Sequence, residues 1–277
     1  MSSRIGRTWP ALAFLLGLPA VGASQNRIFP SVPSFERPEA SPRVHGLAAR
    51  FISAQRGDSR FGKEAEAEVA LGENFPVLAL RRGDRPITLG FGSQVYARFS
   101  LTDAKSALIS NDWVVGLNST AIFGAWAFTV EAYHESSHLG DEYEDRFDAK
   151  RLDWTREVLA AWASYTIGSW RIMGSGSYAL RDELRLERPG GSFGLDFRPP
   201  RRYGTGAMRP VGGVYLDTNA ATSWRVSGSF KAGVVLQATP GGREIGFAVI
   251  GHDGLSTQRQ FFREQSRYLG LEVRFDL

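Results

Sequence analysis

The last nine residues of the chain alternate between apolar side chains and polar or small ones. One set is wholly apolar and consists of Leu269, Leu271, Val273, Phe275 and Leu277. The other set carries charges of both signs and consists of Gly270, Glu272, Arg274 and Asp276. Because successive side chains of a strand point to opposite faces, this pattern predicts a strand with one apolar face and one charged face.

The same alternation recurs along the chain, in segments too long for an ordinary β-sandwich. Apolar residues outside and polar residues inside are typical of a transmembrane β-barrel. We therefore expect an all-β fold, an antiparallel transmembrane β-barrel of about 12 strands. The pattern is weakest in 64–82 and 190–217. The expected strands are 64–71, 75–82, 86–100, 109–119, 124–138, 153–167, 169–182, 190–197, 208–217, 222–236, 241–252 and 263–277.

The expected inner face of these strands carries both positive and negative side chains. They are Arg98, Glu131, Arg171, Arg225, Glu244, Glu272 and Arg274. We infer a lumen filled by a salt-bridged network and too narrow for a wide pore. Trp113, Trp126 and Trp170 fall near strand ends, as the aromatic girdles of such barrels require.

The N-terminal residues predict export to the bacterial outer membrane. Residues 1–23 have the features of a signal peptide, because two arginines precede an apolar run that ends in small residues. A membrane anchor is the alternative, but it would need about 20 apolar residues. A proline-rich periplasmic lead-in without regular structure is expected over 24–60, and the barrel over 61–277. Counting strands back from a periplasmic C-terminus places the turn 139–152 outside the cell.

Composition and charge argue against some classes of cross-link, metal site and binding partner. The chain has no cysteine, so neither disulfides nor thiolate metal sites are available. The formal net charge of +4 falls to +2 once Arg4 and Arg7 are removed with the signal peptide, a balance that does not suggest a nucleic-acid partner.

One short run concentrates residues that can carry chemistry, between Tyr133 and Glu142. His134, Ser136 and His138 continue the apolar parity of the strand 124–138, so we expect them to point outward. A strand crosses the hydrocarbon in about 9–11 residues, which puts these side chains at the outer lipid interface. The ester and amide bonds of outer-leaflet lipids lie at that depth.

A serine and a histidine two residues apart on one face suit acyl transfer, because the imidazole can take the proton of the hydroxyl. A third group must then orient the imidazole. Two other interpretations remain open. The residues are polar side chains at the water boundary, or His134 and His138 hold a metal, which would require a bend near Ser137 because an extended strand separates them by ~13 Å.

An acidic loop follows the strand. Its carboxylates begin at Asp141 and Glu142 and continue through Glu144, Asp145 and Asp148. Hard oxygen ligands suit calcium, which makes Asp141 and Glu142 candidate ligands, although a solvated loop explains the same composition.

The alternation, the C-terminal strand and the run Tyr-His-x-Ser-Ser-His-Leu-Gly-Asp-Glu resemble an uncharacterised family of bacterial outer-membrane proteins known as domain of unknown function 1207. A second, local resemblance spans Asn111 to Trp154 and is to outer-membrane phospholipase A. That resemblance implies a twelve-stranded barrel that hydrolyses lipid acyl esters through an outward His-x-Ser pair. It also implies calcium and a dimeric active form. Lipid A deacylases of the outer membrane carry a related pair.

Carried over by position, the resemblance assigns His134 as the base and Ser136 as the nucleophile. Ser137 falls where both enzyme families usually have asparagine, and Thr155 falls where an asparagine orients the histidine. Thr155 or His138 is then the candidate orienting residue. Two functions stay open: a lipid acyl hydrolase acting on outer-membrane lipids or lipopolysaccharide, and a non-catalytic barrel for surface structure or narrow solute passage.

Overall fold

The computed structural model describes residues 27–30, 34–43, 45–57, 65–82, 85–102, 107–204, 207–237 and 243–275. The signal peptide expected at 1–23 lies outside the described residues. Among those that are described, no helix has the length and apolarity of a membrane span.

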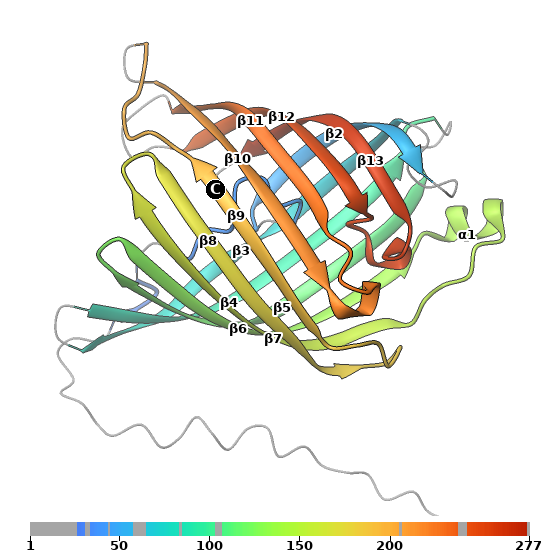
Figure 1. Ribbon diagram of the computed structural model, residues 1–277, viewed down its shortest axis with the longest axis horizontal. Coiled ribbons are helices and arrows are strands. Elements are labelled where there is room, and N and C mark those ends of the chain that lie inside the picture. The colour runs from blue at the N-terminus through green and yellow to red at the C-terminus, as the bar shows by residue number, and fades with distance from the viewer. Residues whose placement is uncertain are drawn as a thin grey trace, which may run out of the picture.

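Twelve strands of the described chain form a closed antiparallel barrel (Figure 1). Each strand pairs with the next in sequence, and β13 pairs with β2, which closes the ring. The strands are β2 (Leu47–Gly57), β3 (Ala65–Arg82), β4 (Arg85–Ser100), β5 (Leu108–Phe123), β6 (Trp126–Leu139), β7 (Trp154–Ile167), β8 (Trp170–Asp182), β9 (Pro189–Phe197), β10 (Met208–Asn219), β11 (Ser227–Gln237), β12 (Glu244–Leu255) and β13 (Gln265–Phe275). The expected fold is confirmed.

Four short elements accompany the ring. A two-residue strand, β1 (Arg27–Ile28), pairs with β3 at Leu78 and Ala79, beyond the part of β3 that pairs with β2. The helix α1 (Asp141–Phe147) and the 3₁₀ turns η1 (Ala220–Thr222) and η2 (Arg259–Phe261) lie in connections at one end of the barrel.

The first barrel strand lies where the sequence predicted an unstructured lead-in. β2 falls within 24–60, so the expected boundary of the barrel at residue 61 is wrong. The inward positions of β2 include Ala48, Arg50 and Ile52, all buried. This mixture of small, charged and apolar residues gives no clear alternation, which is why the pattern missed the strand.

A second difference from the expected strands keeps their total at twelve, because two expected strands are one. The segments 64–71 and 75–82 are one strand, β3, which pairs with β4 through the polar residues between them. A side chain at Gly72 would place its Cβ 2.0 Å from the carbonyl oxygen of Ser93, so glycine permits this close pairing. Asn118 donates a hydrogen bond of 3.0 Å to the amide oxygen of Asn74 across the sheet.

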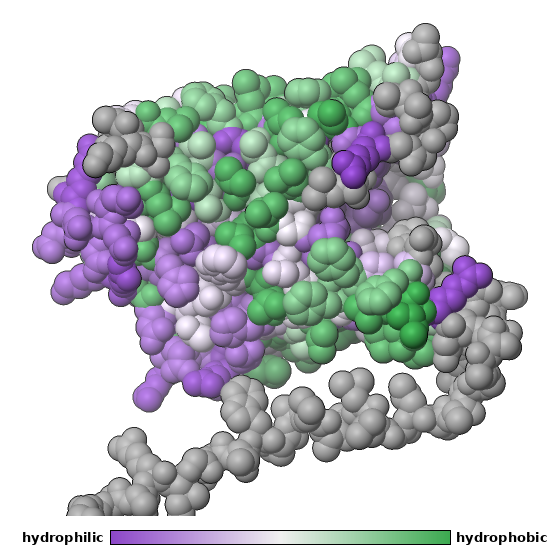
Figure 2. Space-filling model, turned by 180° about the vertical axis from the view of Figure 1, so that it is seen from behind, coloured by the Kyte–Doolittle hydropathy of each residue, from purple (hydrophilic) through white to green (hydrophobic). Residues whose placement is uncertain are grey.

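The outer wall of the barrel is apolar, as the alternation predicts. Its exposed side chains include Phe91, Leu117, Val130, Leu159 and Phe247. Figure 2 shows hydrophobic residues as a green belt across one side of the wall, while purple hydrophilic residues gather at the end that carries α1. Lipid is the solvent that such a belt fits.

The inner wall is held together by buried ion pairs. Arg98, only 1% exposed, bonds Glu68 at 2.6 Å. Arg50 bonds Glu68 at 2.6 Å and Glu272 at 2.7 Å, and Lys231 reaches Glu272 at 2.8 Å. These pairs join β2, β3, β4, β11 and β13, so the predicted salt-bridged lumen is confirmed. Arg225, which was expected on the inner face, is instead exposed in the connection before β11.

Residues 34–43 and 45–46, the N-terminal segment, fold back into the lumen (Figure 1). Arg37 forms an ion pair with Glu131 of β6, and Arg43 bonds Glu135 of the same strand at 2.8 Å. The segment that was expected to be a periplasmic lead-in is therefore part of the barrel interior.

The two ends of the barrel differ in their connections. Two-residue turns, 124–125 and 168–169, join strands at one end. The 140–153 connection with α1 and the 256–264 connection with η2 lie at the other end. Because such barrels have short periplasmic turns and longer external loops, we infer that the α1 end faces outside the cell. The region 190–217 contains two strands, which keeps the orientation expected from the sequence.

Candidate functional site

Strand β6 presents two different faces at its outer end. Glu131, Glu135 and Ser137 are buried and point into the lumen, at 7%, 3% and 5% exposed. His134 and Ser136 occupy the alternate positions and are partly exposed on the outer wall. The structure therefore gives this pair the outward placement expected from parity.

The neighbouring strand β7 supplies the partners of that outward face. In the antiparallel ladder Ser136 lies opposite Thr155, and His134 lies opposite Glu157. Trp154, Val158 and Ala160 are buried on the other face of β7. Thr155 and Glu157 therefore share the outer wall with His134 and Ser136.

Glu157 is the group that contacts the histidine. The Nδ1 atom of His134 lies 2.9 Å from Oε1 of Glu157, within hydrogen-bond distance. The two side chains are 37% and 40% exposed, so the pair lies on the surface of the wall and outside the core. An ionised carboxylate only accepts hydrogen bonds, so this contact assigns the proton to Nδ1 and leaves Nε2 as the basic nitrogen.

Neither orienting residue expected from the sequence has that role in the structure. Thr155 lies opposite Ser136, and its hydroxyl is 3.5 Å from a carboxylate oxygen of Asp153. His138 lies opposite Asn111, beyond the last paired position of β7. Neither makes a hydrogen bond with His134 in the described part of the chain.

Sequence reasoning missed Glu157, although a signal for it exists. The strand β7 alternates buried Trp154, Val158 and Ala160 with outward Leu159, and Glu157 falls in the outward set. A carboxylate among lipid-facing positions is a mark of function, because a charge on that wall costs free energy. The parity of this strand was ambiguous until the register with β6 was known.

Ser136 lies beside His134 on the outer wall without contacting it. His134 and Ser136 are two residues apart on one face, which separates their Cα atoms by ~6.5–7 Å. No hydrogen bond joins them among the described residues. Hydrogen bonds between a catalytic base and a nucleophile often tighten only when substrate binds, so the missing bond leaves the roles expected for the pair open.

From the lumen side, Glu135 anchors the strand beneath the site. Its carboxylate accepts hydrogen bonds from Arg43 at 2.8 Å, from Arg259 at 2.9 Å and from the indole of Trp154 at 3.1 Å. Gln260 of η2 donates to the carbonyl oxygen of Ser137 at 2.9 Å. These contacts hold β6 and β7 in register, so the outward side chains sit on a rigid wall.

Of the two candidate calcium ligands, Asp141 already has a cationic partner. Asp141 and Glu144 of α1 both pair with Arg151, whose guanidinium takes the place that a cation would need. Over the described ranges, no group of three or more histidine, aspartate or glutamate residues is arranged to hold a metal ion. The continuous strand β6 also keeps His134 and His138 apart, because no bend occurs at Ser137.

The fold and the outward wall define an outer-membrane β-barrel protein. The chain belongs to the family described as "Protein of unknown function (DUF1207)", whose model matches residues 23–277. A search of curated proteins returns no match.

Solved structures of outer-membrane phospholipases are similar in fold. The Salmonella typhi outer membrane phospholipase, a dimer with bound calcium, superposes with a TM-score of 0.59 at 12% identity, covering 87% of this chain and 93% of that one. Outer membrane phospholipase A from Escherichia coli gives a TM-score of 0.57 at 12% identity, with 86% and 94% covered. At this identity the similarity concerns the fold alone.

Proposed function

We propose that this barrel is a lipid acyl hydrolase that acts at the outer face of the membrane. Ser136 is the nucleophile, His134 the base, and Glu157 the residue that orients the base. The observation that carries the proposal is the 2.9 Å contact between His134 Nδ1 and Glu157 Oε1, next to a serine on the same outward face. Serine, histidine and carboxylate in this order form the usual arrangement for acyl transfer.

The chemistry follows from the three groups. Ser136 Oγ attacks the carbonyl carbon of an acyl ester while its proton passes to Nε2 of His134. The ester bond then breaks, the alcohol leaves with that proton, and the acyl chain stays on Ser136. Water attacks the acyl-enzyme with His134 again as base, and the fatty acid is released. Glu157 stabilises the imidazolium that forms in each step.

The position of the pair supports a lipid substrate. His134 lies eight residues above Trp126, the outward tryptophan at the turn end of the same strand. A strand crosses the hydrocarbon in about 9–11 residues, so the pair lies near the outer boundary. Trp113, half exposed and opposite Ser136 on β5, marks the same level. Outer-leaflet phospholipid or lipopolysaccharide is the partner that reaches this depth.

A test is fatty-acid release from phospholipid micelles and from lipopolysaccharide by the full barrel in detergent. Ser136→Ala is expected to abolish release and to prevent labelling by a fluorophosphonate. Ser119→Ala, which changes an outer-wall serine of β5 away from the pair, is the matched control and should stay active. Release by Ser136→Ala equal to that of the parent contradicts the proposal.

The same assay tests two further properties separately, namely dependence on calcium and formation of a homodimer. The calcium-bound dimer is a property of the Salmonella phospholipase structure. Asp141 and Glu144 of α1 already pair with Arg151, and the proposed steps are carried by the side chains of this chain alone. Release with calcium and with a chelator, and particle mass in each, will show whether this barrel shares either property.

A second candidate function, a narrow solute path, is favoured by a different observation. One cavity of about 220 Å³ and another of about 340 Å³ occupy the outer and inner halves of the lumen. They share Arg37, His45 and Asn74 as lining residues, so the N-terminal segment separates them. Planar-bilayer recording tests this path. A variant lacking residues 34–43 should conduct more than the parent. If neither protein conducts, the proposal of a solute path is wrong.

A further inference from the structure

The outer half of the lumen contains a polar cavity that the proposed hydrolase chemistry does not use. We propose that this cavity binds a small sugar acid, a monosaccharide-sized solute with a carboxylate, taken from outside the cell. Its residues point inward, whereas His134 and Ser136 point outward. The two proposals therefore stand on different residues and fail independently.

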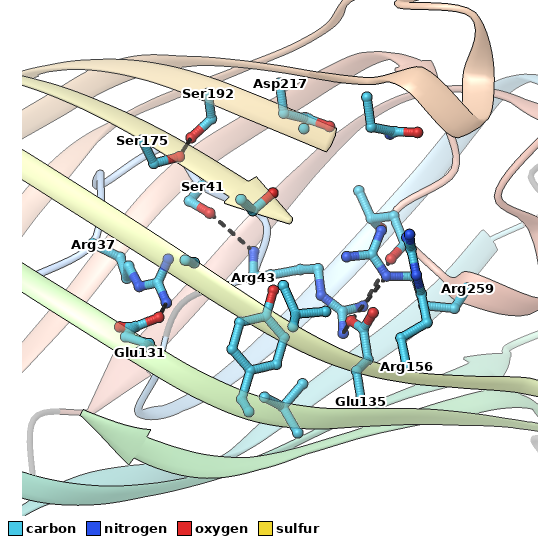
Figure 3. Close-up of a pocket in the computed structure, with 18 of the residues that line it drawn as sticks. Arg37, Ser41, Arg43, Glu131, Glu135, Arg156, Ser175, Ser192, Asp217 and Arg259 are labelled. Atoms are coloured by element: carbon cyan, nitrogen blue, oxygen red, sulfur yellow. Dashed lines mark hydrogen bonds and ion pairs between the residues drawn. The ribbon is translucent and has the colours of Figure 1, made fainter. Parts of the chain in front are cut away.

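Two unlike walls create the cavity. On β8 and β9 the inward positions are short, with Ser175, Ser177, Gly190 and Ser192 along the lining (Figure 3). The hydroxyls of Ser175 and Ser192 lie 2.6 Å apart. Elsewhere the lumen is filled by long arginine and glutamate side chains. Short residues on these two strands therefore leave a space of about 220 Å³.

The opposite wall is aromatic and cationic. The ring of Trp154 lies 5.3 Å from the guanidinium carbon of Arg156 and 5.5 Å from that of Arg259. Figure 3 shows Arg156 and Arg259 next to each other across the cavity from Ser175 and Ser192. Trp154 is buried and the two guanidinium groups lie over its ring, so this wall presents cations to the cavity. Guanidinium groups match a carboxylate in geometry and charge.

Two groups on this wall have hydrogen-bonding capacity that is not used. The Nε atom of Arg259 bonds Glu135, but its two Nη atoms have no hydrogen-bond partner among the described residues. The Nε1 atom of Trp162 is buried without a partner in the same part of the structure, and the residue is 93% buried. An unpaired buried donor costs free energy unless a ligand or water satisfies it.

The charges of the lining favour an anion. Five arginines line the cavity, against three carboxylates: Arg37, Arg43, Arg156, Arg188 and Arg259, with Glu131, Glu135 and Asp217. Four of these arginines pair with carboxylates: Arg37 with Glu131, Arg43 with Glu135 and Asp112, Arg156 with Asp182, and Arg259 through its Nε atom with Glu135. The capacity left for an anion therefore lies in the two Nη atoms of Arg259 and in Arg188, which has no carboxylate partner among the described residues.

Access is from the α1 end. The lining includes Arg188 and Pro189, both exposed at the start of β9, and Asn219 at the end of β10. The floor is the N-terminal segment, fixed through Arg37 and Arg43. A solute therefore enters and leaves on the same side.

The volume of the cavity lies below the ~300–1,000 Å³ of sites for drug-sized molecules, which suits a single sugar ring.

The experiment is isothermal titration of the full barrel in detergent micelles at low ionic strength, with D-glucuronate, D-glucose and inorganic phosphate as probes. Glucuronate is expected to bind at least tenfold more tightly than glucose, because only glucuronate pairs with Arg259. Arg259→Gln should weaken glucuronate at least tenfold. Arg267→Gln is the matched control: the same exchange on the same end of the barrel, in an exposed pair with Asp253 outside the lumen.

Arg259 also holds Glu135, so a second variant separates binding from folding. Ser192→Leu fills the space without changing a charge and should also weaken glucuronate at least tenfold in a barrel that keeps its heat-modifiable gel mobility. Equal binding of glucose and glucuronate, tight phosphate binding without glucuronate binding, or a cavity that binds none of the probes would each overturn the proposal.

Discussion

Glu157 shows how one residue changes the chemistry of the outer wall. A carboxylate on a lipid-facing position costs free energy, and that cost falls toward the interface. Its hydrogen bond to His134 offsets part of that cost and fixes the imidazole tautomer. A histidine at a water boundary needs no such partner, so this pair is the observation on which the proposed catalysis rests.

At this scale the first prediction compares two outward residues of β7. Glu157→Gln is expected to lower the rate of fatty-acid release about tenfold, since replacing a charge-assisted hydrogen bond costs about 1–2 kcal/mol. Thr155→Val, on the same face and next to Ser136, should change it less than about twofold. Initial rates on phospholipid micelles measure both. A larger loss for Thr155→Val than for Glu157→Gln would restore the orienting role to Thr155.

The second residue-scale prediction concerns the buried network. Arg98→Met removes the guanidinium that pairs with Glu66 and Glu68, and leaves two buried carboxylates with fewer partners. Breaking a buried pair from one side costs about 3–5 kcal/mol, so the guanidinium chloride midpoint should fall clearly. Arg267→Met, in an exposed pair, should leave the midpoint in place. Equal midpoints for the two variants would show that the network does not stabilise the barrel.

At the scale of elements, the N-terminal segment decides whether the lumen is open. It touches β6 through Arg37 and Arg43, and β11 through Glu39, which bonds Lys231 at 3.1 Å. Its two ends point toward the same end of the barrel, because β1 pairs with the last third of β3 and Leu47 pairs with Phe275. The segment therefore enters and leaves the lumen on the turn side.

This segment is expected to loosen in acid. Burial, together with the charges of Arg37 and Arg274, lowers the pKa of His45 to about 3 from its ordinary 6.5. The released segment binds the proton more readily, so its docking is strongest above about pH 6.5 and weakens as the pH falls toward 3. Burial opposes ionisation of Glu39, but Lys231 and Arg274 outweigh it and lower its pKa. Glu39 thus keeps its charge to a lower pH than an exposed glutamate.

Bilayer conductance measures the effect. Single-barrel conductance should rise as the pH falls from 6.5 to 4.5, and His45→Gln should remove most of that rise. A rise of the same size in both proteins would assign the acid response to other groups.

For the molecule as a whole, orientation in the membrane determines which lipids and solutes it meets. The longer connections, with α1 and η2, lie at one end, and the two-residue turns lie at the other. The outward Ser136 pair and the polar cavity both lie toward the α1 end. If that end faces outward, both proposed sites meet the cell surface.

Orientation can be tested with single cysteines, because the chain has none of its own. A membrane-impermeant maleimide should label Asp145→Cys of α1 on intact cells. Ala125→Cys, in a two-residue turn, should react only after the outer membrane is permeabilised. The reverse labelling pattern would show that the α1 end faces the periplasm, and both proposed sites with it.

The sequence predicted some elements well and others poorly, for physical reasons that differ. Strands with a long apolar run on the outer face, such as Trp126 to Ala132 in β6 and Leu269 to Phe275 in β13, were predicted nearly to their ends. β2 was missed because Ala48, Arg50 and Ile52 break the contrast between faces. The calcium ligands at Asp141 and Glu142 followed from composition, and the structure shows a local arginine, Arg151, already paired with Asp141.

The two-residue period by itself determined the barrel, its membrane and the outward direction of His134 and Ser136, because parity along one strand is a local property. Only the tertiary structure decided that Glu157 meets the histidine and that the N-terminal segment fills the lumen. Both depend on the register between strands and on closure of the ring, which join residues far apart in the chain.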